Sequence, residues 1–231
     1  MATRTLETRR ERLLATFLLA LAVPCSAQLG VVLALLSHNG RAVLLWAAYV
    51  LAVLVGAGWL AAKIIRGANS LFYLELPPLR MPVLTNVLTK AYSRMAWYFN
   101  EVLPVFIITS MVMWLADRTG ILSQIIRAGE PVMRQIGLPP VTAQAFLLGF
   151  FRRDYGAAGL YDLFARGSLS DNQLLIAAVT LTLFLPCVAQ LTIMIKERGL
   201  FSSLLIVMAI IGVSWLAAYG LYFFLANVPL L

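Results

Sequence analysis

The chain has 231 residues, 61% of them hydrophobic and 12% charged, and its mean hydropathy is +0.88. These values lie outside the range of soluble domains, so we expect one all-α, polytopic membrane domain over residues 1–231, in contact with the lipid bilayer. The basic residues that produce the net charge of +8 lie between apolar segments, where positive-inside sorting explains them, and nucleic acid is not an expected partner.

Five apolar segments are expected to be full membrane spans. They cover residues 13–36, 42–65, 102–116, 172–195 and 200–226. The first segment is too long for the core of a signal peptide, and the arginine-rich residues 1–12 before it predict a cytoplasmic N-terminus.

A sixth apolar segment, residues 141–151, is about half as long as a bilayer requires and stops at Arg152-Arg153-Asp154. An ionised residue at the bilayer centre costs about 2.5–3.5 kcal/mol even on insertion scales, so it usually lines a pathway or pairs internally. The segment is either one span crossed by charge or a half-helix that turns back. The charges are equally compatible with a position at the membrane surface.

Two amphipathic segments separate the spans. Residues 83–95 place apolar side chains on one helical face and basic or polar ones on the other, which predicts a helix lying in the membrane interface. Residues 121–136 show a second such stripe, which we expect to be interrupted at Gly129-Glu130-Pro131.

One short phrase occurs twice, as Pro-Cys-x-Ala-Gln-Leu at residues 24–29 and 186–191, and predicts two related half-structures. Pro24 and Pro186 should each break a helix, because proline lacks the amide proton that the carbonyl one turn earlier requires. Exposed carbonyls would then lie beside Cys25 and Cys187 and beside the amides of Gln28 and Gln190. Such a group could form a cation site, although two kinked helices with inert, packed cysteines would show the same phrase.

Two carboxylates, Glu75 and Asp154, are further candidates for the translocation pathway. A mixed shell of sulfur and oxygen suits borderline metals such as ferrous iron or manganese. There is no P-loop motif, and the single histidine, His38, makes a histidine-based triad improbable, so we do not expect an enzyme.

Several stretches of the chain resemble, in order, the C-terminal part of the membrane domain of the ferrous iron transport protein B family, with its Gate repeats. These stretches are residues 1–7, 24–29, 74–82, 129–131, 149–159 and 186–189. The resemblance implies a bacterial plasma (inner) membrane location and a role for Cys25 and Cys187 in iron passage or its gating. The family's GTPase domain and first Gate portion are absent from this sequence, and Gln28 stands where many relatives have arginine.

The resemblance implies a partner that carries the GTPase, and a homo-oligomer is left open. The first hypothesis is the permease part of an Fe²⁺ uptake system, with the metal passing between the two broken helices as the transported ion and with no bound cofactor. The second is a Gate-type permease for an organic solute such as a nucleoside. The third is a membrane scaffold subunit that transports nothing.

Overall fold

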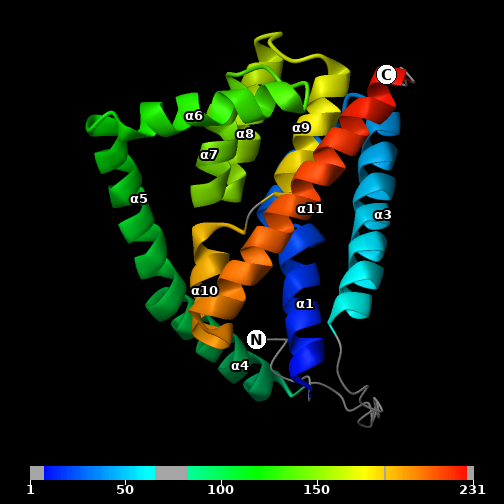
Figure 1. The fold of residues 1–231 in the computed structure, drawn as a ribbon. Helices are drawn as coiled ribbons and strands as arrows, with labels where there is room; N and C mark the ends of the chain where they lie inside the picture. The colour runs from blue at the N-terminus through cyan, green and yellow to red at the C-terminus, as the bar shows by residue number, and fades with distance from the viewer. Residues whose placement is uncertain (1–7, 66–82, 185, 228–231) are drawn as a thin grey trace.

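The computed structural model describes residues 8–65, 83–184 and 186–227, and within these ranges all regular structure is helical. The helices are α1 (Arg9–Ala22), α2 (Ser26–Leu36), α3 (Gly40–Ile64), α4 (Leu84–Trp97), η2 (Tyr98–Val102), α5 (Leu103–Arg118), α6 (Ile121–Gln135), α7 (Thr142–Phe151), α8 (Arg153–Ala165), α9 (Asp171–Leu183), α10 (Val188–Arg198) and α11 (Leu200–Asn227). The predicted all-α membrane fold is thereby confirmed (Figure 1). Four described stretches are long and apolar enough to cross a membrane: Gly40–Ile64, Leu84–Arg118, Asp171–Arg198 and Leu200–Ala226.

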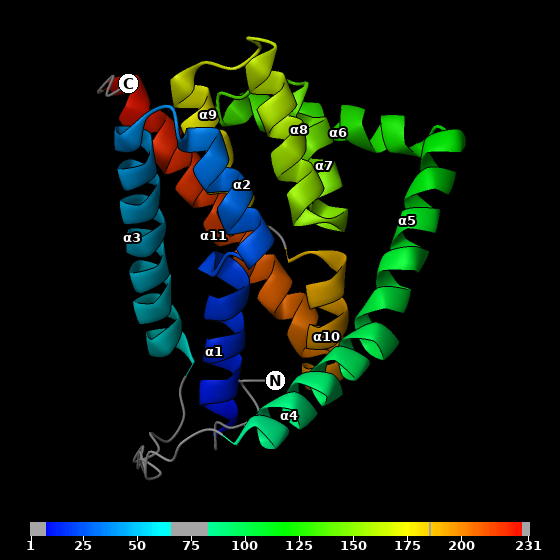
Figure 2. The same cartoon turned by 180° about the vertical axis from the view of Figure 1, so that it is seen from behind.

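Both predicted helix breaks are present. The first separates α1 from α2 and the second separates α9 from α10, and each pair is followed by one long helix, α3 or α11. In Figures 1 and 2 the pair α1–α2 rises from the bottom of the molecule, whereas α9–α10 descends from the top. The two halves of the repeat therefore run in opposite directions, as in transporters built from inverted repeats.

The short segment after residue 141 is a half-helix that turns back. Helices α7 and α8 pack side by side as a hairpin whose tip, at residues 151–153, reaches the middle of the molecule (Figure 1). The turn needs only one extended residue, Arg152, with φ −144° and ψ 121°. A Cβ added to Gly156 would lie 2.6 Å from the Cα of Gly149, so only glycine allows this close approach.

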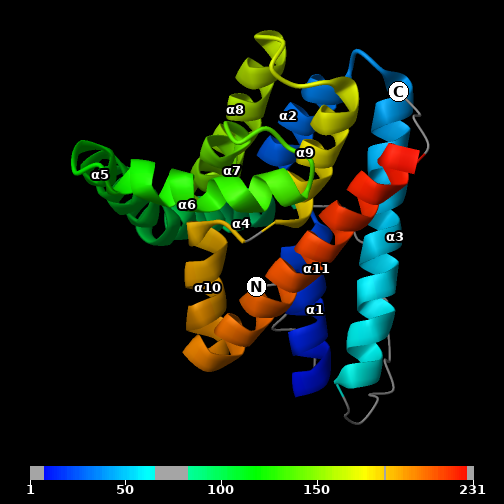
Figure 3. The same ribbon diagram turned by 45° about the horizontal axis from the view of Figure 1, so that its top comes forward.

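Helix α6 corrects one prediction. It continues from Ile121 through Pro131 to Gln135 without the expected interruption. Pro131 is exposed, so the carbonyl that it leaves without a helical partner faces outward rather than into packed protein. Figure 3 shows α6 lying across α7 at the end of the hairpin that is remote from its tip.

The predicted interfacial helix at residues 83–95 corresponds to α4, which has no buried residue. Helix α4 does not stop at its expected end but continues through the π-helical turn η2 into α5. In that turn the amide of Leu103 bonds the carbonyl of Tyr98, five residues earlier, directly before Pro104, which has no amide proton to donate. The placement of α4 in the membrane interface stays a prediction.

Helix α9 is the centre of the core, since every residue from Leu174 to Leu183 is buried. It packs against α1, α2, α3, α8 and α11. The indole Nε1 of Trp46 in α3 donates to the Thr182 hydroxyl at 3.1 Å, close to the end of α9. The second break consequently faces protein, which is the condition under which a broken helix is stable in a membrane.

Candidate functional site

The first break leaves one carbonyl without its helical partner and places a thiol at a helix start. Pro24 cannot donate to the carbonyl of Ala20, four residues earlier. Cys25 is the N-cap of α2, and its Sγ accepts a hydrogen bond from the backbone amide of Gln28 at 3.4 Å. A thiol thus takes the position that serine or threonine usually occupies at a helix N-terminus.

The tip of the α7–α8 hairpin reaches this break through Arg153, whose side chain is buried. Its Nη1 donates to the Oε1 of Gln28 at 3.0 Å, and its Nη2 donates to the carbonyl of Ala20 at 3.4 Å. The carbonyl released by Pro24 is therefore bonded by a cationic side chain from a segment more than 120 residues away.

The second break is tied to the first by the same glutamine. Gln28 is fully buried, and its Nε2 donates to the carbonyl of Leu181 in the last turn of α9 at 3.0 Å. The hydroxyl of Ser214 in α11 donates to the carbonyl of Leu183. Pro186 is buried, and Cys187, half-buried, is the N-cap of α10. Gln28 thus links the two breaks, because it donates to the end of α9 and accepts from Arg153.

The structure separates the predicted site residues into three groups. Gln28 lies in the hydrogen-bond network that links Arg153 to the end of α9. Its counterpart Gln190 is half-buried, and the Gln190 side chain makes no hydrogen bond within the described ranges. Asp154 follows Arg153 in α8, but its side chain is not among those described, and Glu75 lies outside the described residues. Arg153 was not among the predicted pathway residues, although the charge directly after an apolar half-span was a signal for it.

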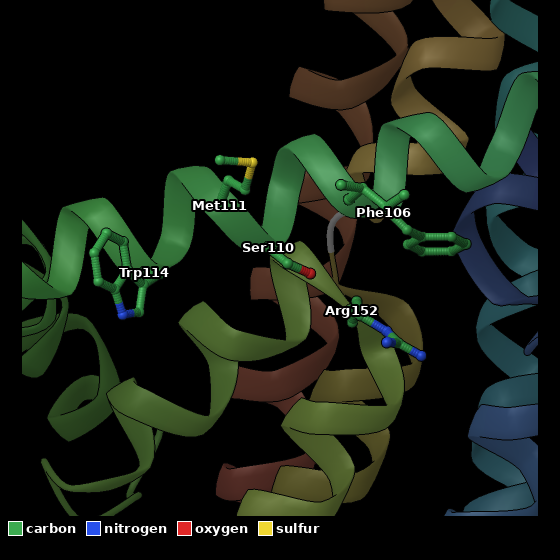
Figure 4. Close-up of a pocket in the computed structure, with 6 residues that line it drawn as sticks. Phe106, Ser110, Met111, Trp114 and Arg152 are labelled. Atoms are coloured by element: carbon green, nitrogen blue, oxygen red, sulfur yellow. The ribbon is translucent and has the colours of Figure 1, made fainter.

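The neighbouring Arg152 faces away from the breaks, toward a cleft of about 460 Å³ between the hairpin tip and α5 (Figure 4). Its guanidinium lies 5.2 Å from the ring centre of Phe106 and 4.5 Å from that of Tyr155, and it donates to the Tyr155 hydroxyl at 3.2 Å. The α5 side of the cleft is formed by Phe106, Ile107, Ser110, Met111 and Trp114. Two adjacent arginines at one turn thus have different surroundings.

The chemistry available at the breaks is that of soft and neutral ligands. No group of three or more histidine, cysteine or acidic side chains that could hold a metal occurs among the described residues. The site offers two free thiols, an amide oxygen and the Ala20 carbonyl. Such a set suits transient passage of a borderline metal better than permanent storage, because transport requires ligation weak enough for release.

Comparisons with known proteins give a consistent family assignment. Residues 43–94 match the family described as "Ferrous iron transport protein B C terminus", and residues 99–201 match the Gate family, described as "Nucleoside recognition". No solved structure matches the chain.

Two curated relatives are similar to the chain. A "Fe(2+) transporter FeoB" of Synechocystis is 27% identical over 191 residues, which are 74% of this chain and 31% of the relative. A "Fe(2+) transport protein A/Fe(2+) transporter FeoB fusion protein" of Porphyromonas gingivalis is 29% identical over 120 residues, 49% of this chain and 14% of the relative. The chain therefore spans less than a third of either relative's length. The two family matches follow one another between residues 43 and 201, and together with the two relatives they support a C-terminal membrane portion of the ferrous iron transport protein B family.

Proposed function

We propose that the chain is the membrane-permease part of a ferrous iron uptake system, in which Fe²⁺ passes between the two Pro-Cys breaks. The observation that carries this proposal is the convergence of both breaks on one buried network, formed by Gln28, Arg153 and the carbonyls of Ala20 and Leu181. The relatives, both named as Fe²⁺ transport proteins, support the choice of metal.

In this proposal Cys25 and Cys187 are transient ligands. Each lies at the start of a half-helix and beside a polar break. Transport requires contacts with the metal that are weak enough for release, which a transient ligand provides. Gln190, Asp154 and Glu75 remain further candidates for the pathway.

The chain would act together with a GTPase-bearing portion or partner, which would energise or gate transport. It would lie in the bacterial inner membrane with its N-terminus in the cytoplasm. It would bind no cofactor and catalyse no reaction, Fe²⁺ being its cargo.

The test is uptake of ferrous iron into vesicles that contain the chain with or without the GTPase-bearing portion. The native chain is compared with Cys25→Ser and Cys187→Ser. Serine is a favoured N-cap, so Cys25→Ser removes the thiol and keeps the helix start. We expect uptake to require the partner and to fall at least severalfold in both variants while assembly is retained.

Two results would contradict the proposal in different ways. Normal uptake in both serine variants would exclude the thiols from the pathway and leave the transport function intact. No uptake under any condition, with assembly demonstrated, would favour a scaffold subunit that transports nothing.

The Gate description favours a second candidate, a permease for a nucleoside. A cavity of about 330 Å³ between α6 and α7 is lined by aromatic rings, among them Phe146 and Phe184, whose centres are 5.7 Å apart. Its lining is otherwise aliphatic and offers no charged or amide side chain to bind a ribose or a base, so the site geometry favours the metal. Uptake of labelled nucleosides that survives loss of both cysteines would reverse this order.

A further inference from the structure

The guanidinium of Arg153 lies where a transported cation would find its ligands. It donates one hydrogen bond to the side-chain amide oxygen of Gln28 and another to the Ala20 carbonyl, which Pro24 leaves without a helical partner. Both are neutral oxygen acceptors of the kind that replace a cation's hydration shell in membrane pathways. The side chain is only 6% exposed, so its charge is held inside protein rather than in water.

A buried charge at this depth has a specific consequence for cations. Two like charges repel each other more strongly inside protein than in water, because the effective dielectric constant is lower there. Cys25 and Cys187 are the N-caps of α2 and α10, and the partial positive charge of helix N-termini adds to the same field. With Arg153 in place, the breaks repel the ion that they are proposed to carry.

The charge belongs to one continuous hairpin, α7–α8. The hairpin α7–α8 enters and leaves on one side of the molecule, and a single extended residue, Arg152, forms its tip (Figures 1 and 2). Arg153 is the first residue of α8, so a shift of this hairpin along its axis would withdraw the guanidinium from Gln28 and from the Ala20 carbonyl together.

We propose that Arg153 is a tethered cation that occupies the cation position between the two breaks and closes the pathway until the α7–α8 hairpin withdraws it. This inference rests on the proposed function and adds its regulation. It distinguishes Arg153 from an arginine that only holds the helices together, because only a guanidinium in the cation position would compete with Fe²⁺ for the same ligands.

The experiment measures labelling of Cys187 in the purified full chain carrying Cys25→Ser. Two thiol reagents are compared, the cationic trimethylammonioethyl methanethiosulfonate and the neutral hydroxyethyl methanethiosulfonate. Arg153→Gln removes the charge and keeps an amide donor, Arg153→Lys keeps the charge, and Arg152→Gln is the matched neighbour. We expect the ratio of cationic to neutral labelling rates to rise about tenfold in Arg153→Gln and to stay near the native value in the other two.

A second variant keeps the test valid if Arg153→Gln does not fold. Gln28→Glu places a carboxylate against the guanidinium and offsets its charge without removing it. The labelling ratio should therefore rise in Gln28→Glu as it does in Arg153→Gln. An unchanged ratio in Arg153→Gln or in Gln28→Glu, or an equal rise in Arg152→Gln, would overturn the proposal.

Protection by the metal separates this inference from the proposed function. Fe²⁺, added without oxygen, should slow labelling of Cys187 in Arg153→Gln at least severalfold more than in the native chain. Equal protection in both chains would show that metal and guanidinium do not compete, which overturns the tethered-cation role while the metal pathway stands. If the labelling ratio rises in Arg153→Gln but Fe²⁺ protects Cys187 in no variant, the electrostatic barrier stands and the metal pathway is overturned.

Discussion

Replacing Gly156 with alanine should force the α7–α8 hairpin apart. The new Cβ would lie 2.6 Å from the Cα of Gly149, 2.8 Å from the carbonyl oxygen of Ala145 and 3.0 Å from the Gly149 amide nitrogen. All three are backbone atoms, so no side-chain rotation can relieve the overlap. Since carbon atoms pack at about 3.5–4.0 Å, the two helices must separate locally by roughly 1 Å.

The energetic effect follows from this overlap. Overpacking of a filled core typically costs about 1–3 kcal/mol. For a chain of this size, each kcal/mol lowers the melting temperature by about 2–4 °C, so Gly156→Ala should lower the apparent Tm by about 2–12 °C. The separation would also move Arg153, three residues earlier, relative to Gln28.

The assay is thermal unfolding of the purified chain in detergent, followed by size-exclusion chromatography. The matched control is Gly30→Ala in α2, where an added Cβ meets nothing within 4 Å. Alanine in place of an unhindered helical glycine should stabilise by about 0.5–1 kcal/mol, so this control should melt at or above the native temperature. An unchanged Tm for Gly156→Ala would refute the close packing of the two helices.

Three further experiments test the core around the breaks and the course of helix α6. Gln28→Leu should lower stability by about 1–3 kcal/mol in thermal unfolding because it leaves buried polar groups without a partner, whereas Gln190→Leu should change it by less than about 0.5 kcal/mol. A double-mutant cycle of Trp46→Phe and Thr182→Val should give a coupling energy of about 0.5–1.5 kcal/mol, and additive effects would contradict their hydrogen bond. Pro131→Ala should raise the apparent Tm, because it restores a backbone donor inside a continuous helix; a lower Tm would mean that the ring itself stabilises α6.

Proline shows how far the sequence predicts this fold. Pro24 and Pro186 were predicted to break helices, and both do. At the first break Arg153 bonds the Ala20 carbonyl, and at the second Gln28 and Ser214 bond the carbonyls of Leu181 and Leu183. Pro131 was also expected to interrupt its helix, yet α6 continues through it on an exposed surface. The residue type is the same in all three cases, and the difference arises from tertiary surroundings that local sequence does not contain.

The direction of the α7–α8 segment could not be predicted for a similar reason. An apolar half-span followed by charges is compatible with a crossing or with a return. Small residues such as Gly156 allow another backbone to approach closely, but the sequence does not say which segment supplies it. The structure resolves this because Gly149 and Gly156 contact each other, which requires the chain to reverse between them.

The candidate site was predicted in part. The repeated phrase identified both breaks and Gln28, because proline chemistry and repetition are visible in the sequence. Arg153 was not predicted, since its acceptors lie 125 and 133 residues away and are set by how the hairpin inserts. Its charge could be recognised as costly, but its partners could not.

The asymmetry between the two glutamines follows from the inserted hairpin. The two halves of the repeat run in opposite directions (Figure 1). Each half has one glutamine three residues after its cysteine, Gln28 in the first and Gln190 in the second. A single hairpin tip carries one inward arginine and can bond only one of these two positions at a time. It bonds Gln28, and that glutamine in turn bonds the end of α9 in the other half. The hairpin therefore makes the two breaks unequal in their hydrogen bonds, although their sequences are alike.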